Sequence, residues 1–234
     1  MASWMEETKK NVQTLGKQGF FDNWLKKETE FITFLVHPDT KLNEDWFKKR
    51  VATYKINAER LKIIPPKVIF YVYPSLEFGK ERGVTPATSF IKSKEIHGHP
   101  HQSPGHELTH ILLGEVNNTD NLPANGIWSE GLCVFLDGTN TDRRKHALSI
   151  GYAQDITNAS WEKWRQNLPG NLYPLAGSII QYLDGLFGWE KILVFLKELK
   201  NSGGNDAELS EGILNKKYSK LQEDWRKWLK LKEG

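Results

Sequence analysis

The chain has 234 residues, and its 32 basic and 29 acidic residues leave a formal net charge of only +3. So slight a charge argues against a nucleic-acid partner. The length suffices for a large core, and neither a low-complexity linker nor a repeat divides it, so we expect a single domain over residues 1–234. The single cysteine, Cys133, excludes an intrachain disulfide, and its apolar neighbours predict a buried thiol.

The N-terminal segment shows no export or anchoring pattern. Residues 1–10 lack the hydrophobic centre of a signal peptide, and no apolar stretch in the chain reaches transmembrane length. We therefore expect a soluble protein without a membrane span. The compartment and the oligomeric state are left open by the sequence.

The first part of the chain alternates between helical and extended patterns. A charge-rich helical start precedes a predicted strand at Glu30–Val36. Asn43 is the expected cap of a helix that keeps an apolar face as far as Leu61, and an apolar strand is predicted at Val68–Tyr73. The segment Thr88–Ile96 is predicted to be a short strand. Together these patterns indicate a small sheet with helices.

Three histidines stand close together in His97-Gly98-His99-Pro100-His101. The glycine and proline predict a loop at the rim of a cleft, and a second metal site is the alternative. The HxHxDH pattern of metallo-β-lactamases is incomplete here, because its Asp-His pair is missing and Gln102 and Ser103 follow the histidines.

The segment His106-Glu107-Leu108-Thr109-His110 matches the zinc-protease spacing HExxH. Residues four apart share one face of a helix, so both imidazoles can reach one zinc ion at about 2 Å. Glu107 lies at the flank, where it can take a proton from the water that the metal activates. We expect Ser103 to cap this helix and Gly114 to end it.

A catalytic zinc site needs a third protein ligand, and Glu130 is the candidate. It lies in Ile127–Leu136, whose apolar residues recur at helical spacing, and Asp137-Gly138 marks the end of this second helix. Before it, residues 115–126 have the composition of a loop.

This arrangement resembles the gluzincins, and in particular the peptidase MA-like metallohydrolases with a Trp-Leu-Ser-Glu-Gly-Leu sequence. Here the segment is Trp128-Ser129-Glu130-Gly131-Leu132, one residue shorter before the glutamate. The resemblance implies one Zn²⁺ per chain and a peptide or protein substrate, paired along the edge strand predicted at Thr88–Ile96. Because such relatives often carry export signals, the chain is also consistent with the mature form of an exported protein.

The resemblance extends to residues 173–183, which look like the family's helix downstream of the metal. It makes Tyr173 the leading candidate for the donor that stabilises the oxyanion, with His146 and Tyr152 as alternatives. Thermolysin-like enzymes place an aspartate one turn after the ligating glutamate, where this chain has Val134. Asp137 lies nearly two turns on, so the group that orients His106 is left open.

Competing patterns fail on residue identity. A metzincin requires Gly and His where this chain has Leu113 and Val116, and the Gly-x-Met-Glu-Asn motif of one-zinc aminopeptidases is absent. Recognition of a free amino end is thus unsupported, which favours an endopeptidase. The nine tryptophans suggest carbohydrate binding, but pairs such as Trp225 and Trp228 have the spacing of helix-packing aromatics.

The sequence therefore predicts an α+β protein. A small mixed sheet with helices is expected over about residues 1–102, a mostly helical part over 103–234, and the zinc site in the cleft between them. The predicted function is that of a zinc metalloendopeptidase. Two alternatives are a noncatalytic domain that binds a peptide or protein partner, which has no need of the intact Glu107, and a zinc hydrolase of a non-peptide substrate.

Overall fold

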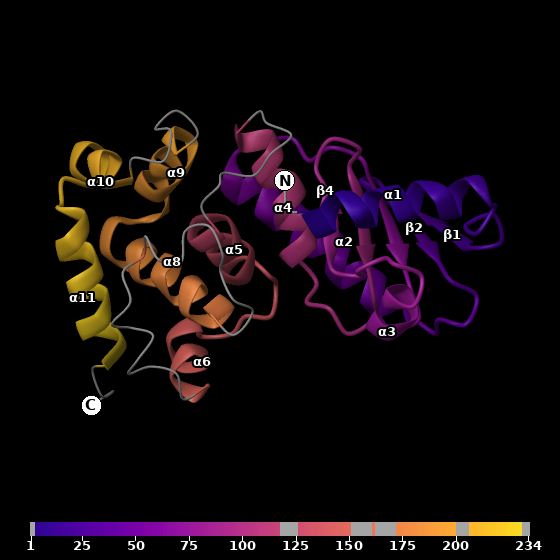
Figure 1. The fold of residues 1–234 in the computed structure, drawn as a ribbon. Helices are drawn as coiled ribbons and strands as arrows, with labels where there is room; N and C mark the ends of the chain where they lie inside the picture. Colours follow the sequence, from indigo (N-terminus) through magenta and orange to yellow (C-terminus); the bar gives the residue numbers. More distant parts are fainter. Residues whose placement is uncertain (1–2, 118–125, 151–160, 162–171, 200–205, 231–234) are drawn as a thin grey trace. The chain divides into compact units, whose positions relative to one another are not determined.

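The computed structural model describes residues 3–117, 126–150, 161, 172–199 and 206–230, and Figure 1 traces their course. The fold is α+β, as predicted, with a five-stranded mixed sheet in the N-terminal half and mainly helices after it. The chain divides into two compact units. One comprises Met1–Asn121 with Asp137–Thr139, and the other comprises Leu122–Leu136 with Asn140–Gly234.

The first unit is built on a sheet with strand order β1-β2-β3-β5-β4. The central pairs β2–β3 and β3–β5 are parallel, whereas β1 and β4 are antiparallel to their neighbours. The helices and strands of this unit are α1 (Ser3–Lys17), β1 (Leu25–Glu28), β2 (Ile32–Val36), α2 (Glu44–Leu61), β3 (Val68–Val72), α3 (Leu76–Lys80), β4 (Thr88–Phe90), β5 (Glu95–Gly98) and α4 (His106–Asn117).

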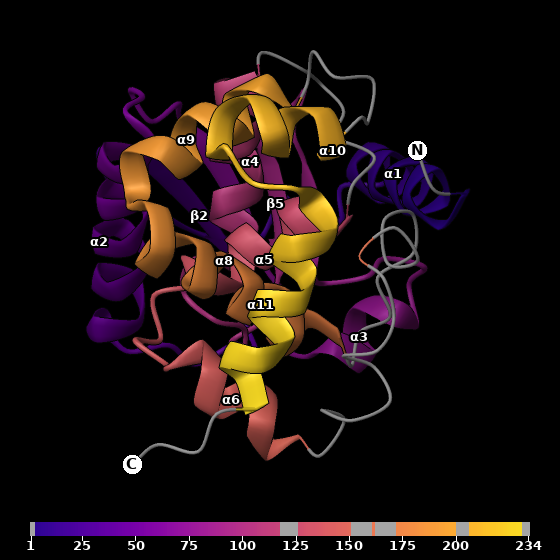
Figure 2. The same ribbon diagram turned by 90° about the vertical axis from the view of Figure 1, so that its left-hand side faces the viewer.

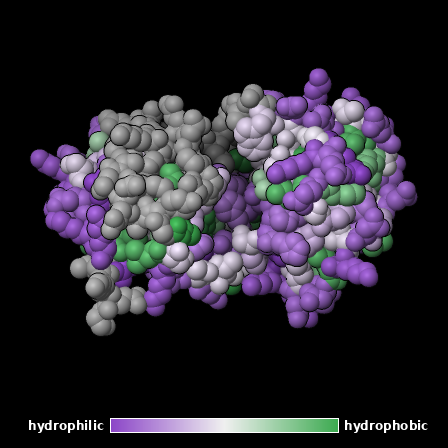
Figure 3. Space-filling view, turned by 60° about the horizontal axis from the view of Figure 1, so that its bottom comes forward, coloured by the Kyte–Doolittle hydropathy of each residue, from purple (hydrophilic) through white to green (hydrophobic). Residues whose placement is uncertain are grey.

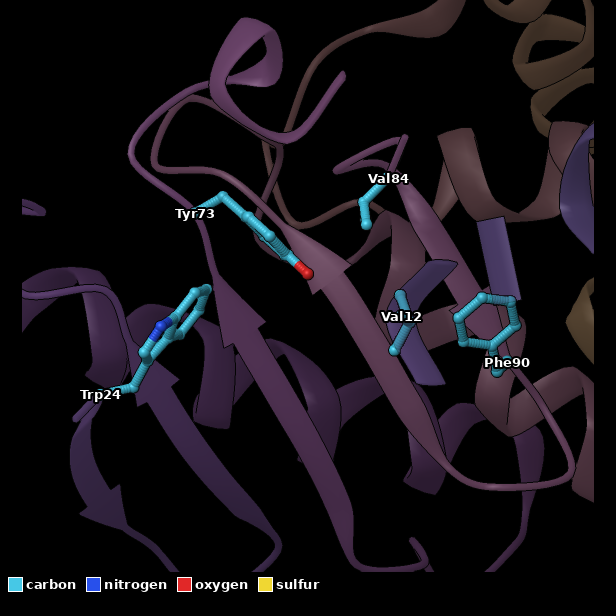
Figure 4. Close-up of a cluster of buried hydrophobic side chains, with 5 residues drawn as sticks. All are labelled: Val12, Trp24, Tyr73, Val84 and Phe90. Carbon is cyan, nitrogen blue, oxygen red and sulfur yellow. The ribbon is translucent and has the colours of Figure 1, made fainter. Parts of the chain in front are cut away.

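The two faces of this sheet bury different sets of side chains, because residues alternate between faces along each strand. On one face Phe34 of β2 and Phe70 of β3 stack and pack against Phe47 of α2. The opposite face carries a second cluster, which is drawn in Figure 4 and contains Val12, Trp24, Tyr73, Val84 and Phe90. The sheet is thus covered on both faces, by α2 and α4 on one side and by α1 on the other.

The segment predicted as one strand at Thr88–Ile96 is instead a hairpin. Strand β4 ends at Phe90, a turn follows, and β5 begins at Glu95. Lys94 at the end of the turn has a φ of 57°, in the left-handed region. The prediction was wrong because a lysine at positive φ carries no sequence signal of the kind that Gly or Asn provides.

The prediction of a loop for His97 was also wrong, since His97 and Gly98 belong to β5. The side chain of His97 is fully buried. Its Nδ1 lies 2.9 Å from the hydroxyl of Tyr73, and its ring stacks on Tyr71 with 4.6 Å between ring centroids. Tertiary contacts therefore override the loop preference of the neighbouring glycine and proline.

The burial of His97 predicts that acid destabilises the fold. Burial lowers the pKa of His97 from 6.5 to about 3. Below pH 6.5 the unfolded chain therefore binds a proton at His97 that the folded chain does not bind. The contribution of neutral His97 to stability is then fully present above pH 6.5 and is lost as the pH drops toward 3. From pH 7.5 to 5 this histidine should lower the free energy of unfolding by about 2 kcal/mol.

Urea unfolding of metal-free protein at these two pH values measures the effect. His97→Asn removes the titration while its amide oxygen can still accept a hydrogen bond from Tyr73, so its pH dependence should be weaker. Burial also lowers the pKa of His37, but that contribution is common to both proteins. An equal pH dependence in wild type and His97→Asn would contradict the assignment.

The second unit is helical in its described residues. Helix α8 lies against α5, α6, α9 and α11, and Figure 2 shows α11 running in front of the view. The unit comprises α5 (Gly126–Phe135), α6 (Arg143–Ser149), α8 (Tyr173–Phe187), α9 (Trp189–Glu198), α10 (Asp206–Leu209), the π-helical turn η2 (Ser210–Leu214) and α11 (Tyr218–Lys230). Its core contains the fully buried Trp161 and Trp225, whose ring centroids are 5.9 Å apart. Trp164 lies outside the described residues.

Helices α5 and α8 come close together at Gly131. A Cβ placed there would meet the carbonyl oxygen of Ala176 at 2.7 Å, so this contact requires a residue without a side chain. We expect Gly131→Ala to destabilise the protein by about 1–3 kcal/mol, because backbone has to shift to make room. Gly185→Ala is the matched control.

Beyond the backbone of its own helix, no atom of the described residues lies within 4 Å of a Cβ added at Gly185, which is also on α8. Alanine is the better helix former, so Gly185→Ala should raise stability by about 0.5–1 kcal/mol. Urea unfolding of both variants measures the difference. Equal stability of the two variants would show that the α5–α8 contact is looser than these distances imply.

On the face drawn in Figure 3, most of the described side chains are hydrophilic and the hydrophobic ones form small separate patches. Exposed apolar side chains of this kind are ordinary on protein surfaces, so no function is assigned to them. The large ones are Trp4, Leu25, Ile56, Ile64, Ile69, Leu148, Leu186 and Val194. None of the helices in the described part of the chain combines the length and the apolar character that crossing a membrane requires.

Candidate metal centre

Helix α4 begins at His106, so both histidines of the HExxH segment lie within it, as predicted. Their ring centroids are 5.0 Å apart, as expected for side chains one helical turn apart on the same face. The prediction that Gly114 ends the helix was wrong, because the helix runs on to Asn117 and Gly114 is buried inside it. His106 is half-buried and His110 is buried.

Helix α4 is held in place by its middle residues. The hydroxyl of Thr109, fully buried, donates to the carbonyl of Gly105 at 2.7 Å and accepts from the side-chain amide of Asn57 on α2 at 2.9 Å. Because Thr109 precedes His110, this anchor fixes the rotation of the helix about its axis. It thereby sets the direction in which both imidazoles point.

The segment before α4 is clamped by α2 as well. The indole nitrogen of Trp46 donates to the carbonyl of Pro100 at 2.9 Å, and the guanidinium of Arg50 donates to that of Gln102 at 2.7 Å. Arg50 also lies over the Trp46 ring, 3.4 Å from its centroid. Burial lowers the pKa of Arg50 to about 9, so the guanidinium stays charged at neutral pH. The start of α4 is therefore fixed from the preceding chain.

Glu107 follows His106 and points toward strand β4. Its exposed fraction is 9%, and the hydroxyl of Ser89 lies 2.6 Å from its Oε2 and 2.9 Å from its backbone oxygen. Its place in the first turn of α4 also puts a carboxylate at the positive end of the helix dipole. Glu107 is thus held close to the two histidines.

Glu130 lies on α5 and is half-buried. Two residues near Glu130 in the sequence, Trp128 and Gly131, hold this helix in place. The buried Trp128 donates its indole N–H to Asp206 at 2.9 Å, and Gly131 contacts α8. As predicted, Cys133 on the same helix is buried and forms no disulfide. The rotation of α5, and with it the direction of Glu130, is therefore set by packing.

The three predicted ligands come together. One ligand atom from each of His106, His110 and Glu130 lies within 4.8 Å of the others, and among the described residues this is the one such group of three or more that could hold a metal ion. The other histidine pair, His99 and His101, lies after β5 with ring centroids 6.3 Å apart and is not part of it.

The remaining candidates are placed without a test of their roles. Tyr173 is half-buried and is the first residue of α8, with Pro174 in the first turn, as expected for a helix start. His146 lies on α6, and Tyr152 falls outside the described residues. Asp137 accepts hydrogen bonds from the backbone and hydroxyl of Thr139. The oxyanion donor and the group orienting His106 stay predictions.

Ser89 was not identified from the sequence. The only signal is a serine between Thr88 and Phe90 in a strand whose residues are all buried, which indicates a hydrogen-bond partner in the interior. That partner, Glu107, is 18 positions away along the chain and is brought to Ser89 by the fold.

Comparison of the chain with protein-family models, with curated proteins and with solved structures found no match.

Proposed function

We propose that this protein is a zinc-dependent peptide hydrolase of the gluzincin type. His106, His110 and Glu130 would hold the zinc, and Glu107 would act as the general base. The observation that carries the proposal is the approach of one ligand atom from each of the three residues to within 4.8 Å of the others.

The donor set fits catalytic zinc. Two imidazoles and one carboxylate are a known ligand set of zinc hydrolases, and three protein ligands leave a fourth position open for water or substrate. Ligands of a tetrahedral zinc, each about 2 Å from the ion, lie about 3.3 Å apart. The ligand atoms, within 4.8 Å of one another here, would move closer to that spacing on binding zinc.

Zinc bound there supplies a Lewis acid that polarises the scissile carbonyl and lowers the pKa of a water molecule. Glu107 would take one proton from the attacking water as the oxygen of that water bonds to the carbonyl carbon. The same carboxyl group then passes the proton to the amide nitrogen as the C–N bond breaks, so that a carboxyl end and an amine are released. A protein that only binds a peptide has no use for this base.

Strand β4 supports a peptide as the substrate. Among the described residues it is the last strand in the sheet order and pairs with β5 alone, so its other edge is the one that would pair with an extended peptide. Lys92 and Lys94, which would blunt an edge strand, lie in the turn after β4 rather than in it. Backbone pairing holds a chain at internal residues, which agrees with cleavage of internal bonds.

The test is hydrolysis of a diverse peptide mixture with blocked ends, read by mass spectrometry. We expect cuts at internal bonds with zinc-loaded protein, none after removal of the metal with a chelator, and recovery when zinc is added back. Intact peptides in the presence of protein that carries one zinc per chain would contradict the proposal.

A further inference from the structure

The contact between Ser89 and Glu107 joins the edge strand to the helix of the metal centre. The distance of 2.6 Å from Oγ to Oε2 is in the range of a hydroxyl bound to a carboxylate, and the 2.9 Å contact to the backbone oxygen of Glu107 is longer. A serine hydroxyl has a single hydrogen, so the shorter contact identifies its main acceptor as the carboxylate.

The register of the hairpin aims Ser89 at α4. Ser89 pairs with Ile96 of β5, and Phe90 on the next position belongs to the cluster on the opposite face, beside His97. Because side chains alternate along a strand, Ser89 has to point to the face that α4 covers. The exposed fraction of Ser89 is only 9%, so water does not compete freely for its hydroxyl.

This bond matters for catalysis because a glutamate side chain is otherwise free to rotate. A base that misses its proton by about 1 Å can lose about a hundredfold in rate. Because Ser89 holds Oε2, the other carboxylate oxygen, Oε1, is the one that can face the attacking water.

We propose that Ser89 is a positioning residue for Glu107, holding Oε2 so that Oε1 takes the proton. This inference rests on the proposed function, since it assigns the base its working oxygen. The side chain of Ser89 touches neither metal nor substrate in this assignment, because a peptide on the edge of β4 would pair with the backbone alone. Its effect should therefore fall on kcat, with KM and zinc content unchanged.

The kinetic test compares three variants on a blocked peptide that the zinc-loaded wild type cleaves. Ser89→Ala should lower kcat by about tenfold to a hundredfold. Ser89→Thr, which keeps the hydroxyl, should retain most of it. Ser93→Ala removes an exposed hydrogen bond of the same kind, to Glu95 at 2.8 Å, and should match the wild type. Wild-type kcat in Ser89→Ala, or equal losses in the Ala and Thr variants, would overturn the proposal.

A second test needs no activity. Crystal structures of zinc-loaded wild type and Ser89→Ala should show one position of the Glu107 carboxylate in the first and a displaced or spread carboxylate in the second. An unchanged carboxylate in Ser89→Ala would overturn the positioning role. If the wild type cleaves no peptide, the proposed function fails, while this comparison still decides whether Ser89 holds Glu107.

Discussion

Glu107→Gln is expected to keep its zinc and to lose peptide hydrolysis by a factor of about 10² to 10⁴. The amide has nearly the shape of the carboxylate and can still accept the bond from Ser89, so the fold and the three ligands are retained. What is lost is the ability to take a proton from water. Zinc content and the initial rate on a blocked peptide are the two quantities to measure.

Glu115→Gln is the matched control for this variant. Glu115 lies on the same helix and pairs with Lys94 at the surface, away from the HExxH segment. Its rate should equal that of the wild type. Full turnover in Glu107→Gln would remove the mechanism, whereas loss of zinc in this variant would show that Glu107 acts through the metal ligands.

Glu130→Ala is expected to weaken zinc binding by more than about 100-fold, the upper value for loss of a residue that only supports a ligand. Two imidazoles remain, but the anionic donor is gone. Competition with a chromophoric chelator measures the dissociation constant. Glu190→Ala, an exposed glutamate in the first turn of α9, serves as the control and should bind zinc like the wild type.

An unchanged affinity in Glu130→Ala would mean that the third ligand lies elsewhere. Unfolding by urea without metal distinguishes this from a loss of fold. Glu130 is half-buried, and its helix is fixed by Trp128 and Gly131, so metal-free Glu130→Ala should stay folded.

The elements that carry the proposed ligands could be predicted because their signals are local. Helical spacing of apolar residues predicted α5, Asn43 caps α2 as expected, and the HExxH spacing works only on a helix. The α+β class follows from the same patterns. The predicted bounds of α4 were wrong at both ends, since the helix starts at His106 without the expected cap at Ser103 and continues past Gly114 to Asn117.

The features that the sequence did not predict are those that depend on residues far apart in the sequence. Strand β1 has the sequence Leu-Lys-Lys-Glu, which has no apolar alternation, and it is a strand because β2 pairs with it along its length. His97 is buried by Tyr71 and Tyr73, which neither glycine nor proline beside it reveals. The Ser89–Glu107 bond likewise exists only once the hairpin has formed.

The central claim, that His106, His110 and Glu130 bind zinc, is tested most directly by anomalous diffraction from crystals of zinc-loaded protein at wavelengths on either side of the zinc edge. We predict one zinc per chain, about 2 Å from an imidazole nitrogen of each histidine and from a carboxylate oxygen of Glu130. Zinc bound at His99 and His101 instead, or no zinc at the three residues, would contradict the account.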